Sequence, residues 1–311
     1  MKVAWVFPGQ GSQSVGMASA LTQDAPEARD VFARVDEALG FALSELIATG
    51  PESELTKTEH AQPAIVATSA ALLAVLRARF PGLPAPAFVA GHSLGEYSAL
   101  VAAGALSLEA AVRLVRARGQ AMQLAVPVGA GAMAAIIGLE PSVIAALCTE
   151  YAQGEIVSCA NFNAPGQVVI AGHAGAVARV SDAVSAHKGR AIALKVSAPF
   201  HCALMAPAAH VVERALAACE VGPLAFPIVA NIDAASSSDG AVAKQKLVAQ
   251  VTGAVYWQSS VEAMSASGVT HFVEIGPGRV LTALVKRISK GAHLTNISDL
   301  ASLMAYGEGL S

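Results

Sequence analysis

Ser93 lies in the pentapeptide GHSLG (91–95), directly after the apolar run AFVA (87–90). A serine between two glycines, on a tight turn from a strand to a helix, is the pattern of a nucleophile elbow that exposes the hydroxyl. Such a serine needs a base, and the base needs a group that orients it. The pattern predicts nucleophilic catalysis at Ser93, with a plain glycine-rich turn as the alternative.

His201 is the candidate for that base. It lies in the segment SAPFHCALM (197–205), where Pro199 favours a loop over the interior of a helix. We expect this loop to overhang Ser93, and we expect the neighbouring His92 to point away from the serine. The other histidines have ordinary surface or helical contexts: His60, His173, His187, His210, His271 and His293.

An acidic third member of a triad is hard to find. The acids between Ser93 and His201 are Glu96, Glu109, Glu140, Glu150, Glu155 and Asp182, and all but Glu96 have the sequence context of a surface. A backbone carbonyl can also orient a histidine, by accepting the N–H of its ring. The residues therefore predict a Ser–His dyad whose third member is a carbonyl oxygen.

Two backbone amides are candidates for an oxyanion hole. The amide of Leu94 lies at the start of a predicted helix and has no helical acceptor. The segment FPGQGSQ (7–13) follows a predicted strand of the same sheet, and its glycines would let the amide of Gln10 approach a ligand closely. A phosphate-binding loop is the rival interpretation, but the third glycine of GxGxxG would fall at Ser14 and no lysine follows.

Arg118 is the clearest indication of the substrate. On the predicted helix VRLVRARGQAM (112–122) it shares one face with apolar residues, which are Ala111, Leu114, Val115, Met122 and Ala125. An unpaired buried charge is costly, so this arginine needs a partner. The partner is either an internal acid or a substrate carboxylate, which the guanidinium would bind through two parallel hydrogen bonds.

The elements that must position these residues alternate between short β-rich runs and helical patterns, which indicates an α/β fold with a parallel sheet. Strands are expected at 3–7, just before Ser93, near 226–231 and at 270–276. Helices are expected at 26–39, 62–79, from Glu96, from an N-cap at Ser107 to about 125, and at 203–219, 241–251, 258–266 and 279–290.

The middle of the chain has a different rhythm. Its expected elements are a strand at 131–139, a helix at 141–152, strands at 156–162 and 167–172, a helix at 174–187 and a strand at 190–197. This β-α-β-β-α-β order is the ferredoxin-like arrangement. We therefore expect a small ferredoxin-like subdomain at 127–197, inserted into a large α/β domain made of residues 1–126 and 198–311.

Composition restricts the class of protein. The 311 residues are 54% apolar and 14% charged, with a net charge of −3, which is typical of a well-buried globular chain and argues against nucleic acid or an anionic membrane as the main partner. The cysteines Cys148, Cys159, Cys202 and Cys219 form no CxxC pair, so we expect buried thiols, and no metal site, in a reducing compartment.

Two apolar segments bear on location. Only five apolar residues precede Pro8, too few for a secretory core. The longest apolar stretch (64–76) is judged too short to span a bilayer. The chain is therefore expected to be cytoplasmic.

The whole pattern resembles the malonyl-CoA:acyl carrier protein transacylases of bacterial fatty-acid synthesis, which are related to the acyltransferase domains of polyketide synthases. The matching segments are FPGQGSQ (7–13), AQPA (61–64), GHSLGEYSALVAAGAL (91–106), VRARGQAM (115–122), ANFNAPGQVVIAG (160–172), APFHCALM (198–205) and VEIGPGRVL (273–281). Residues 251–257 and the tail after His293 match least well. The resemblance implies an α/β-hydrolase-like core with a ferredoxin-like insert.

The resemblance also implies roles for individual residues. Ser93 would be the nucleophile, His201 the base, and Arg118 the partner of the malonyl carboxylate. The amides of Gln10 and Leu94 would form the oxyanion hole, and the carbonyl of Gln250 would hold the histidine. Gln62, Asn161 and Asn163 resemble residues that line the site, and Phe200 resembles the variant associated with malonyl over methylmalonyl selectivity.

The implied reaction is ping-pong transfer of a malonyl group from malonyl-CoA to the phosphopantetheine thiol of acyl carrier protein, by a monomer with no bound cofactor. The alternatives are an acyltransferase that serves a polyketide synthase or a malonate-decarboxylase system, and, in another class, a serine thioesterase or hydrolase. The intact set of Ser93, His201 and Arg118 argues against a catalytically dead carrier-binding subunit. Docking of the acidic carrier would need a local basic patch, for which the candidates are Lys188, Arg190, Lys286, Arg287 and Lys290.

Overall fold

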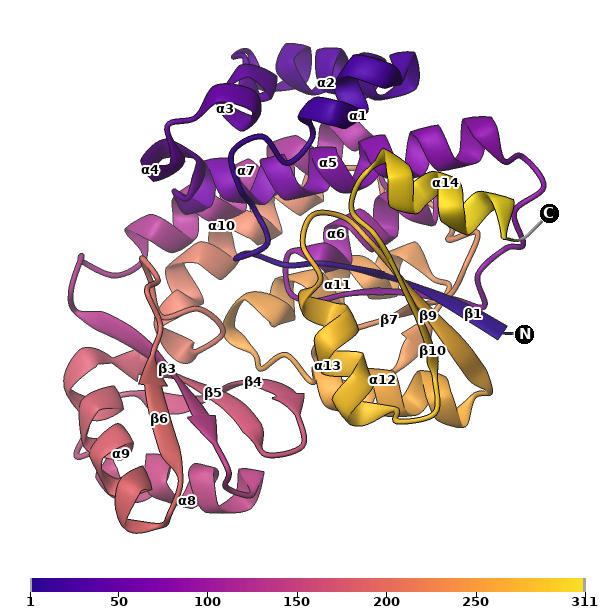
Figure 1. The fold of residues 1–311 in the computed structure, drawn as a ribbon. Helices are drawn as coiled ribbons and strands as arrows, with labels where there is room; N and C mark the ends of the chain where they lie inside the picture. The colour runs from indigo at the N-terminus through magenta and orange to yellow at the C-terminus, as the bar shows by residue number, and fades with distance from the viewer. Residues whose placement is uncertain (1, 310–311) are drawn as a thin grey trace.

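The chain folds around two separate β-sheets (Figure 1), as a computed structural model that describes residues 2–309 shows. The larger sheet has six strands in the order β10-β9-β1-β2-β7-β8. Its strands are β1 (Lys2–Phe7), β2 (Phe88–Gly91), β7 (Ile228–Val229), β8 (Ser236–Ser237), β9 (Val269–Ile275) and β10 (His293–Ile297). All neighbours pair in parallel except β7 and β8, which pair antiparallel.

Helices cover both faces of the parallel sheet. In β1, Val3, Trp5 and Phe7 join one hydrophobic cluster, while Ala4 and Val6 join another on the opposite face. Alternate side chains of a strand point to opposite faces, so a central strand buried on both sides must be apolar throughout. The helices that contribute to the first cluster include α2 (Pro26–Leu39), α5 (Thr58–Arg79), α6 (Gly95–Ala102), α7 (Leu108–Leu124), α10 (Ala206–Ala217) and α14 (Leu300–Glu308), and those of the second are α12 (Trp257–Ala266) and α13 (Val280–Ile288).

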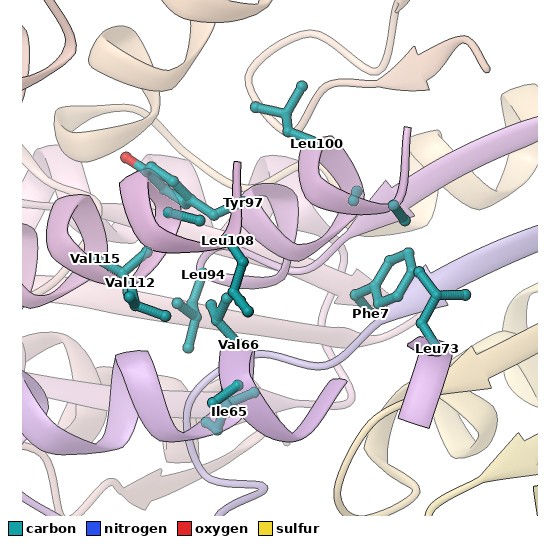
Figure 2. Packing of buried hydrophobic residues seen from close by; sticks show 14 of the residues in the cluster. Phe7, Ile65, Val66, Leu73, Leu94, Tyr97, Leu100, Leu108, Val112 and Val115 are labelled. Carbon is teal, nitrogen blue, oxygen red and sulfur yellow. The ribbon is translucent and has the colours of Figure 1, made fainter. Parts of the chain in front are cut away.

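The first cluster sets the position of the turn that carries Ser93. Figure 2 shows Leu94 and Tyr97, one and four residues after the serine, packed among buried residues of α5 and α7. Leu94 is 1% exposed and Tyr97 is 0% exposed, so the start of α6 is anchored in the core. The turn that carries Ser93 is thereby attached to a close-packed part of the core.

The apolar stretch around 64–76 was expected to be too short to span a membrane, and that reason is wrong. The helix α5 that contains it has 22 residues and is long and apolar enough to cross a membrane. However, 78% of its most apolar 18-residue segment is buried inside the protein. Its hydrophobicity is therefore explained by packing at the centre of the larger unit.

The second sheet is antiparallel and has four strands in the order β4-β5-β3-β6. Its strands are β3 (Gly131–Ile137), β4 (Val157–Ala164), β5 (Gln167–His173) and β6 (Arg190–Ala193), and the helices α8 (Pro141–Tyr151) and α9 (Ala174–Ala186) pack on one face of it. The expected β-α-β-β-α-β order of elements is confirmed. The domain boundaries at 126/127 and 197/198 stay a prediction.

The two sheets are joined by backbone hydrogen bonds as well as by the chain. Phe162 N donates to Val255 O at 2.8 Å, and Val255 N donates to Ala160 O at 2.9 Å. The segment before α12 therefore lies against β4 like a short additional strand, with a parallel bridge from Val255 to Asn161. These bonds place the inner edge of the small sheet next to the carboxyl ends of the parallel strands.

Several elements differ from the expected ones at their ends. The strand expected at 190–197 ends at Ala193, and the strand expected at 226–231 has only two residues, Ile228–Val229. The helix expected at 62–79 begins at Thr58, and Pro63 is its sixth residue, inside the helix, where proline supplies no N–H for a helical hydrogen bond. The elements not expected at all are short or terminal: α1 (Ser19–Asp24), α3 (Leu43–Thr49), α4 (Glu52–Leu55), β8, β10 and α14.

The expected fold class is confirmed, whereas the expectation that every cysteine is buried is wrong for Cys159 and Cys219, which are half-buried. The chain is an α/β protein with a parallel sheet and a separate antiparallel sheet, whereas the specific likeness to α/β-hydrolases stays a prediction. Helix α11 (Gly240–Thr252) and the 3-10 turn η1 (Ala203–Met205) complete the larger unit. All four cysteines are free thiols, with Cys148 and Cys202 buried and the other two half-buried.

Candidate active site

A cleft of about 350 Å³ lies between the two sheets. One wall consists of the loop after β1 and the turn after β2, and the opposite wall carries Met133, Val169 and Leu194 of the small unit. Ser93 and His201 both line this cleft. The cavity of about 420 Å³ between α1, α2 and α3 contains none of the predicted site residues.

The turn at Ser93 is held in an unusual backbone conformation. Ser93 has a φ of 51°, in the left-handed region that costs an ordinary residue roughly 1–2 kcal/mol. Its backbone N–H donates to Asn231 Oδ1 at 2.6 Å, which stabilises the turn. A Cβ on Gly91 would lie 1.9 Å from the carbonyl carbon of Gly95, and one on Gly95 would lie 2.1 Å from the carbonyl oxygen of Phe7. Both flanking glycines are therefore required by close backbone contacts.

Ser93, His201 and Gln250 form a continuous hydrogen-bonded line. Ser93 Oγ lies 2.6 Å from His201 Nε2, and His201 Nδ1 lies 2.8 Å from the backbone carbonyl oxygen of Gln250. Because the carbonyl can only accept, Nδ1 carries the proton and Nε2 is free to accept one from the serine. No acid contacts the histidine among residues 2–309, and the arrangement has the geometry expected of a dyad with a carbonyl as third member.

Arg118 is buried against Ser93 and is not one of the residues that line the cleft. Its side chain donates from Nη1 to Gln62 Oε1 at 2.8 Å and from Nη2 to both Ser93 Oγ and Gln250 Oε1 at 3.0 Å. It is 2% exposed and makes no ion pair within 4.0 Å with any described acid. Its Nε atom is buried without a hydrogen-bond partner. The sequence allowed either an internal acid or a substrate carboxylate as the partner of Arg118. Among residues 2–309, no acid lies within 4.0 Å of its guanidinium.

Burial and the charge of Arg118 act on the other titratable groups of the site. Burial, which disfavours the charged imidazolium, is the larger cause that lowers the pKa of His201 to about 3, and the positive charge of Arg118 is the second. Burial raises the pKa of Glu96 to about 7, although hydrogen bonds from Gln250 and Asn231 and the charge of Arg118 oppose that rise. Neutral histidine is the form that can accept a proton from Ser93.

The two candidate oxyanion-hole amides face the same cleft. Gln10 and Leu94 both line it, and neither backbone N–H donates a hydrogen bond to another residue in the range 2–309. The Gln10 side chain donates to Thr58 Oγ1 at 3.1 Å, which ties its loop to the start of α5. An amide with no partner at the edge of a cleft is available to a ligand oxygen.

The other residues expected to line the site fall into two groups. Asn161, Asn163 and Phe200 line the cleft, while Gln62 lies behind it, buried against Arg118. His92 also lines the cleft, and its ring nitrogen Nε2 lies 2.8 Å from Asn163 Oδ1; no described hydrogen bond joins its ring to Ser93. This bond links the elbow to β4 of the small unit.

The basic candidates for docking lie outside the cleft. Arg190 is exposed on β6. Arg287, on α13, donates to Gln167 Oε1 and to Pro165 O, the latter at 2.8 Å, and so fastens the β4–β5 turn to the larger unit. Lys286 and Lys290 also belong to or follow α13, and Lys188 lies in the turn before β6.

Two buried polar residues of the site were missed or left without a role by the sequence analysis. Asn231 is 0% exposed, and its Nδ2 donates to Gly91 O at 2.7 Å while its Oδ1 accepts from Ser93. Its position just after β7 was the available signal, because β7 is adjacent to the strand that leads to the elbow. Glu96 had no surface context in the sequence, and the structure buries it under the elbow.

Comparison with known proteins gives a consistent result. The family model of the acyl transferase domain matches residues 4–306. The chain is 50% identical over 286 residues to the malonyl CoA-acyl carrier protein transacylase of Escherichia coli (strain K12), which is 92% of either protein. It is 44% identical over 300 residues to the protein of the same name from Bacillus subtilis (strain 168), covering 96% of this chain and 94% of that protein.

Solved structures show the same similarity in three dimensions. The crystal structure of an acyl carrier protein S-malonyltransferase from Vibrio cholerae O1 biovar eltor superposes with a TM-score of 0.95 at 47% identity, covering 98% of this chain and 100% of that one. A malonyl-transacylase solved in complex with a type II PKS acyl-carrier protein gives a TM-score of 0.96 at 46% identity, covering 99% and 100%.

Proposed function

The chain belongs to the acyl transferase domain family, and on that premise we propose that it transfers the malonyl group of malonyl-CoA to the phosphopantetheine thiol of an acyl carrier protein. The observation that carries this proposal is the position of Ser93 Oγ, 2.6 Å from His201 Nε2 and 3.0 Å from Arg118 Nη2. A nucleophile is thus placed between a base and a buried cation, as malonyl transfer requires.

In the first half-reaction, His201 Nε2 takes the proton of Ser93 as Oγ attacks the thioester carbonyl carbon. The amides of Gln10 and Leu94 donate to the oxygen that becomes negative. When the C–S bond breaks, the proton passes from His201 to the sulfur, and coenzyme A leaves as the thiol. The product is a malonyl ester on Ser93.

In the second half-reaction the thiol of the carrier's phosphopantetheine attacks this ester. His201 takes the thiol proton and returns it to Ser93 Oγ as the C–O bond breaks. Arg118 holds the malonyl carboxylate throughout, with Gln62 behind its guanidinium. Asn161, Asn163 and Phe200 line the space beside the acyl group.

Intact-mass spectrometry tests this sequence of events. Wild-type protein mixed with malonyl-CoA should gain one malonyl group, and holo carrier protein added afterwards should remove it and become malonylated. Ser93→Ala should gain nothing, and Arg113→Ala, on the exposed face of α7, should behave like the wild type. An adduct that decays to free malonate without reaching the carrier identifies a thioesterase or hydrolase instead.

A second candidate function differs only in the pathway supplied. The similarity to a malonyl-transacylase bound to a type II PKS acyl-carrier protein favours testing a polyketide carrier beside a fatty-acid carrier. The carrier of a malonate-decarboxylase system is tested as a third acceptor. The carrier with the highest kcat/KM defines the pathway, and we expect this to be the carrier of fatty-acid synthesis.

Four further properties are proposed with this function. The enzyme acts in the cytoplasm, as a monomer, without a bound cofactor, and residues 127–197 form an inserted subdomain. In the range 2–309 no cluster of three His, Cys, Asp or Glu side chains could hold a metal ion. Light scattering of the purified protein, alone and with carrier, tests the monomer, and limited proteolysis near residues 127 and 197 tests the boundaries.

A further inference from the structure

Glu96 is a buried carboxyl group that the mechanism above does not use. It lies in the first turn of α6, three residues after Ser93, and is 1% exposed. No lysine, arginine or histidine nitrogen of the described residues lies within 4.0 Å of it. A buried carboxylate without a paired cation is costly, so its presence calls for a reason.

The contacts of Glu96 lead to both residues that hold the elbow. Its Oε2 accepts from Gln250 Nε2 at 2.8 Å and from the backbone N–H of Asn231 at 3.2 Å. Gln250 Nε2 also donates to the carbonyl oxygen of Ser93 at 2.9 Å, and Asn231 Oδ1 accepts the N–H of Ser93. One carboxylate oxygen therefore lies behind the two supports of the nucleophile.

Glu96 is one of three groups, with the Ser93 carbonyl and Arg118, that favour one orientation of the Gln250 amide. An amide has two orientations related by a half-turn, and they exchange its donor and acceptor ends. In the observed orientation Nε2 faces Glu96 and the Ser93 carbonyl, while Oε1 accepts from Arg118 Nη2 at 3.0 Å. In the reverse orientation, the amide NH₂ would meet the guanidinium, donor against donor, and Oε1 would meet the carboxylate.

We propose that Glu96 is a positioning residue for acyl transfer. By bonding Gln250 it holds the amide that accepts from Arg118, and by bonding Asn231 it holds the residue that accepts from the N–H of Ser93. This role rests on the malonyl transfer proposed above. Its specific consequence is that loss of the carboxylate should affect the preference for a malonyl over an acetyl group, and not only the rate.

The protonation state of Glu96 gives this role a pH signature. The charged or titratable groups that act on it are Arg118 on α7, Tyr97 on α6 and Asp233 in the loop after β7. With burial raising its pKa to about 7, Glu96 is a carboxylate above that pH and a carboxylic acid below it. The acid accepts hydrogen bonds more weakly, so the hold on Gln250 and Arg118 should loosen as the pH falls.

Two substitutions separate positioning from mere support of the fold. Glu96→Gln keeps an acceptor oxygen but has neither charge nor titration, and Glu96→Leu removes the acceptor at similar volume. Glu262→Leu, on the exposed face of α12, is the matched control. The measurements are kcat and KM for Ser93 acylation by malonyl-CoA and acetyl-CoA between about pH 5.5 and 9, with thermal unfolding of each variant.

We expect Glu96→Leu to lower kcat/KM for malonyl-CoA about 10- to 100-fold and to narrow the malonyl preference about 10-fold. Glu96→Gln should have a kcat/KM close to that of the wild type. Its preference for malonyl-CoA should not change with pH, whereas the preference of the wild type should change near pH 7. If Glu96→Leu does not fold, the pH profile of Glu96→Gln decides alone.

Four results would overturn the proposal. A Glu96→Leu variant with normal malonyl preference, even at lowered stability, assigns Glu96 to the fold only. A Glu96→Gln variant that retains the change near pH 7 shows that another group titrates. Wild-type protein that accepts no malonyl group refutes the malonyl transfer and this role together, whereas normal malonylation with unaltered variants refutes this role alone.

Discussion

Arg118 Nη2 and Ser93 Oγ are in direct contact, with 3.0 Å between them. In a malonyl ester only one methylene separates the ester carbonyl from the free carboxylate. A group that binds the carboxylate must therefore lie beside the nucleophile, and the contact between Arg118 and Ser93 meets that requirement of the proposed mechanism. Gln62 and Gln250 each accept one hydrogen bond from the guanidinium and keep it there without neutralising it.

Replacing Arg118 should abolish the preference for a charged acyl group. A charge-assisted hydrogen bond contributes about 1.5–3 kcal/mol, and an acetyl group would leave the buried arginine unpaired. We expect the wild type to prefer malonyl-CoA over acetyl-CoA by tens- to hundreds-fold, and Arg118→Ala to lose most of that preference. Competition between the two thioesters for Ser93, followed by mass spectrometry, measures this. Equal use of both by the wild type would contradict the role.

The low pKa of His201 should make the fold sensitive to acid. The unfolded chain binds a proton at this residue below about pH 6.5, whereas the folded protein keeps it neutral down to about pH 3. The unfolded state therefore binds more protons in this window, and stability falls as the pH falls through it. Glu96 acts in the opposite sense between about pH 4.5 and 7, because its folded pKa is the higher one.

The neutral variant His201→Gln isolates the histidine contribution. Its free energy of unfolding should decline less steeply than that of the wild type between about pH 6 and 4, by up to roughly 1 kcal/mol per pH unit. Urea unfolding at a series of pH values measures the difference. Parallel curves for the two proteins would mean that the histidine is already protonated in the native state.

Asn231 should matter for the rate more than for substrate binding. Asn231→Asp keeps an acceptor for the N–H of Ser93 but loses the donor to Gly91 O, whereas Asn231→Ala loses both. We expect kcat to fall about 10-fold or more in the alanine variant, with a smaller change in KM, because the strained turn is no longer held. Steady-state kinetics of both variants would show this, and a change confined to KM would rule it out.

Arg190 and Arg287 should respond differently to charge reversal. Arg190 is exposed on β6, so Arg190→Glu should raise the KM for an acidic carrier several-fold and leave acylation by malonyl-CoA unchanged. Arg287 bonds the β4–β5 turn, so Arg287→Glu should also lower the melting temperature. Carrier titrations at two salt concentrations, with a melting curve for each variant, distinguish them. An unchanged carrier KM removes Arg190 from the docking surface.

The sequence predicted the candidate catalytic and substrate-binding residues better than the residues that hold them in place. The serine turn, the histidine loop and the arginine on an apolar face all have local signatures, in spacing or in periodicity. Asn231 and Glu96 have none, because their meaning depends on strands that are distant in sequence becoming neighbours in the sheet. The partner of His92 was not predicted for a related reason: Asn163 belongs to the other sheet.

The same distinction explains the errors in the fold. Long periodic segments such as 26–39 and 141–152 were placed to within a residue. The strand expected near 226–231 was found as β7, but only two of its residues pair with β2, and the two-residue strand β8 has no pattern long enough to recognise. The stretch 64–76 was judged too short to span a membrane from its apolar run alone, although the helix that contains it, expected at 62–79, extends from Thr58 to Arg79.

The backbone bonds between Val255 and β4 affect how this architecture can vary. An insert attached only by its two connecting segments could swing as a hinged lid, or be exchanged for that of a relative as a module. Here a third attachment runs through the segment before α12, so the gap between the units is set by the main chain. A chimera that exchanges 127–197 should therefore also exchange the residues around Val255. Otherwise the hydrogen bonds between Val255 and β4 would be lost, and the width of the cleft would change.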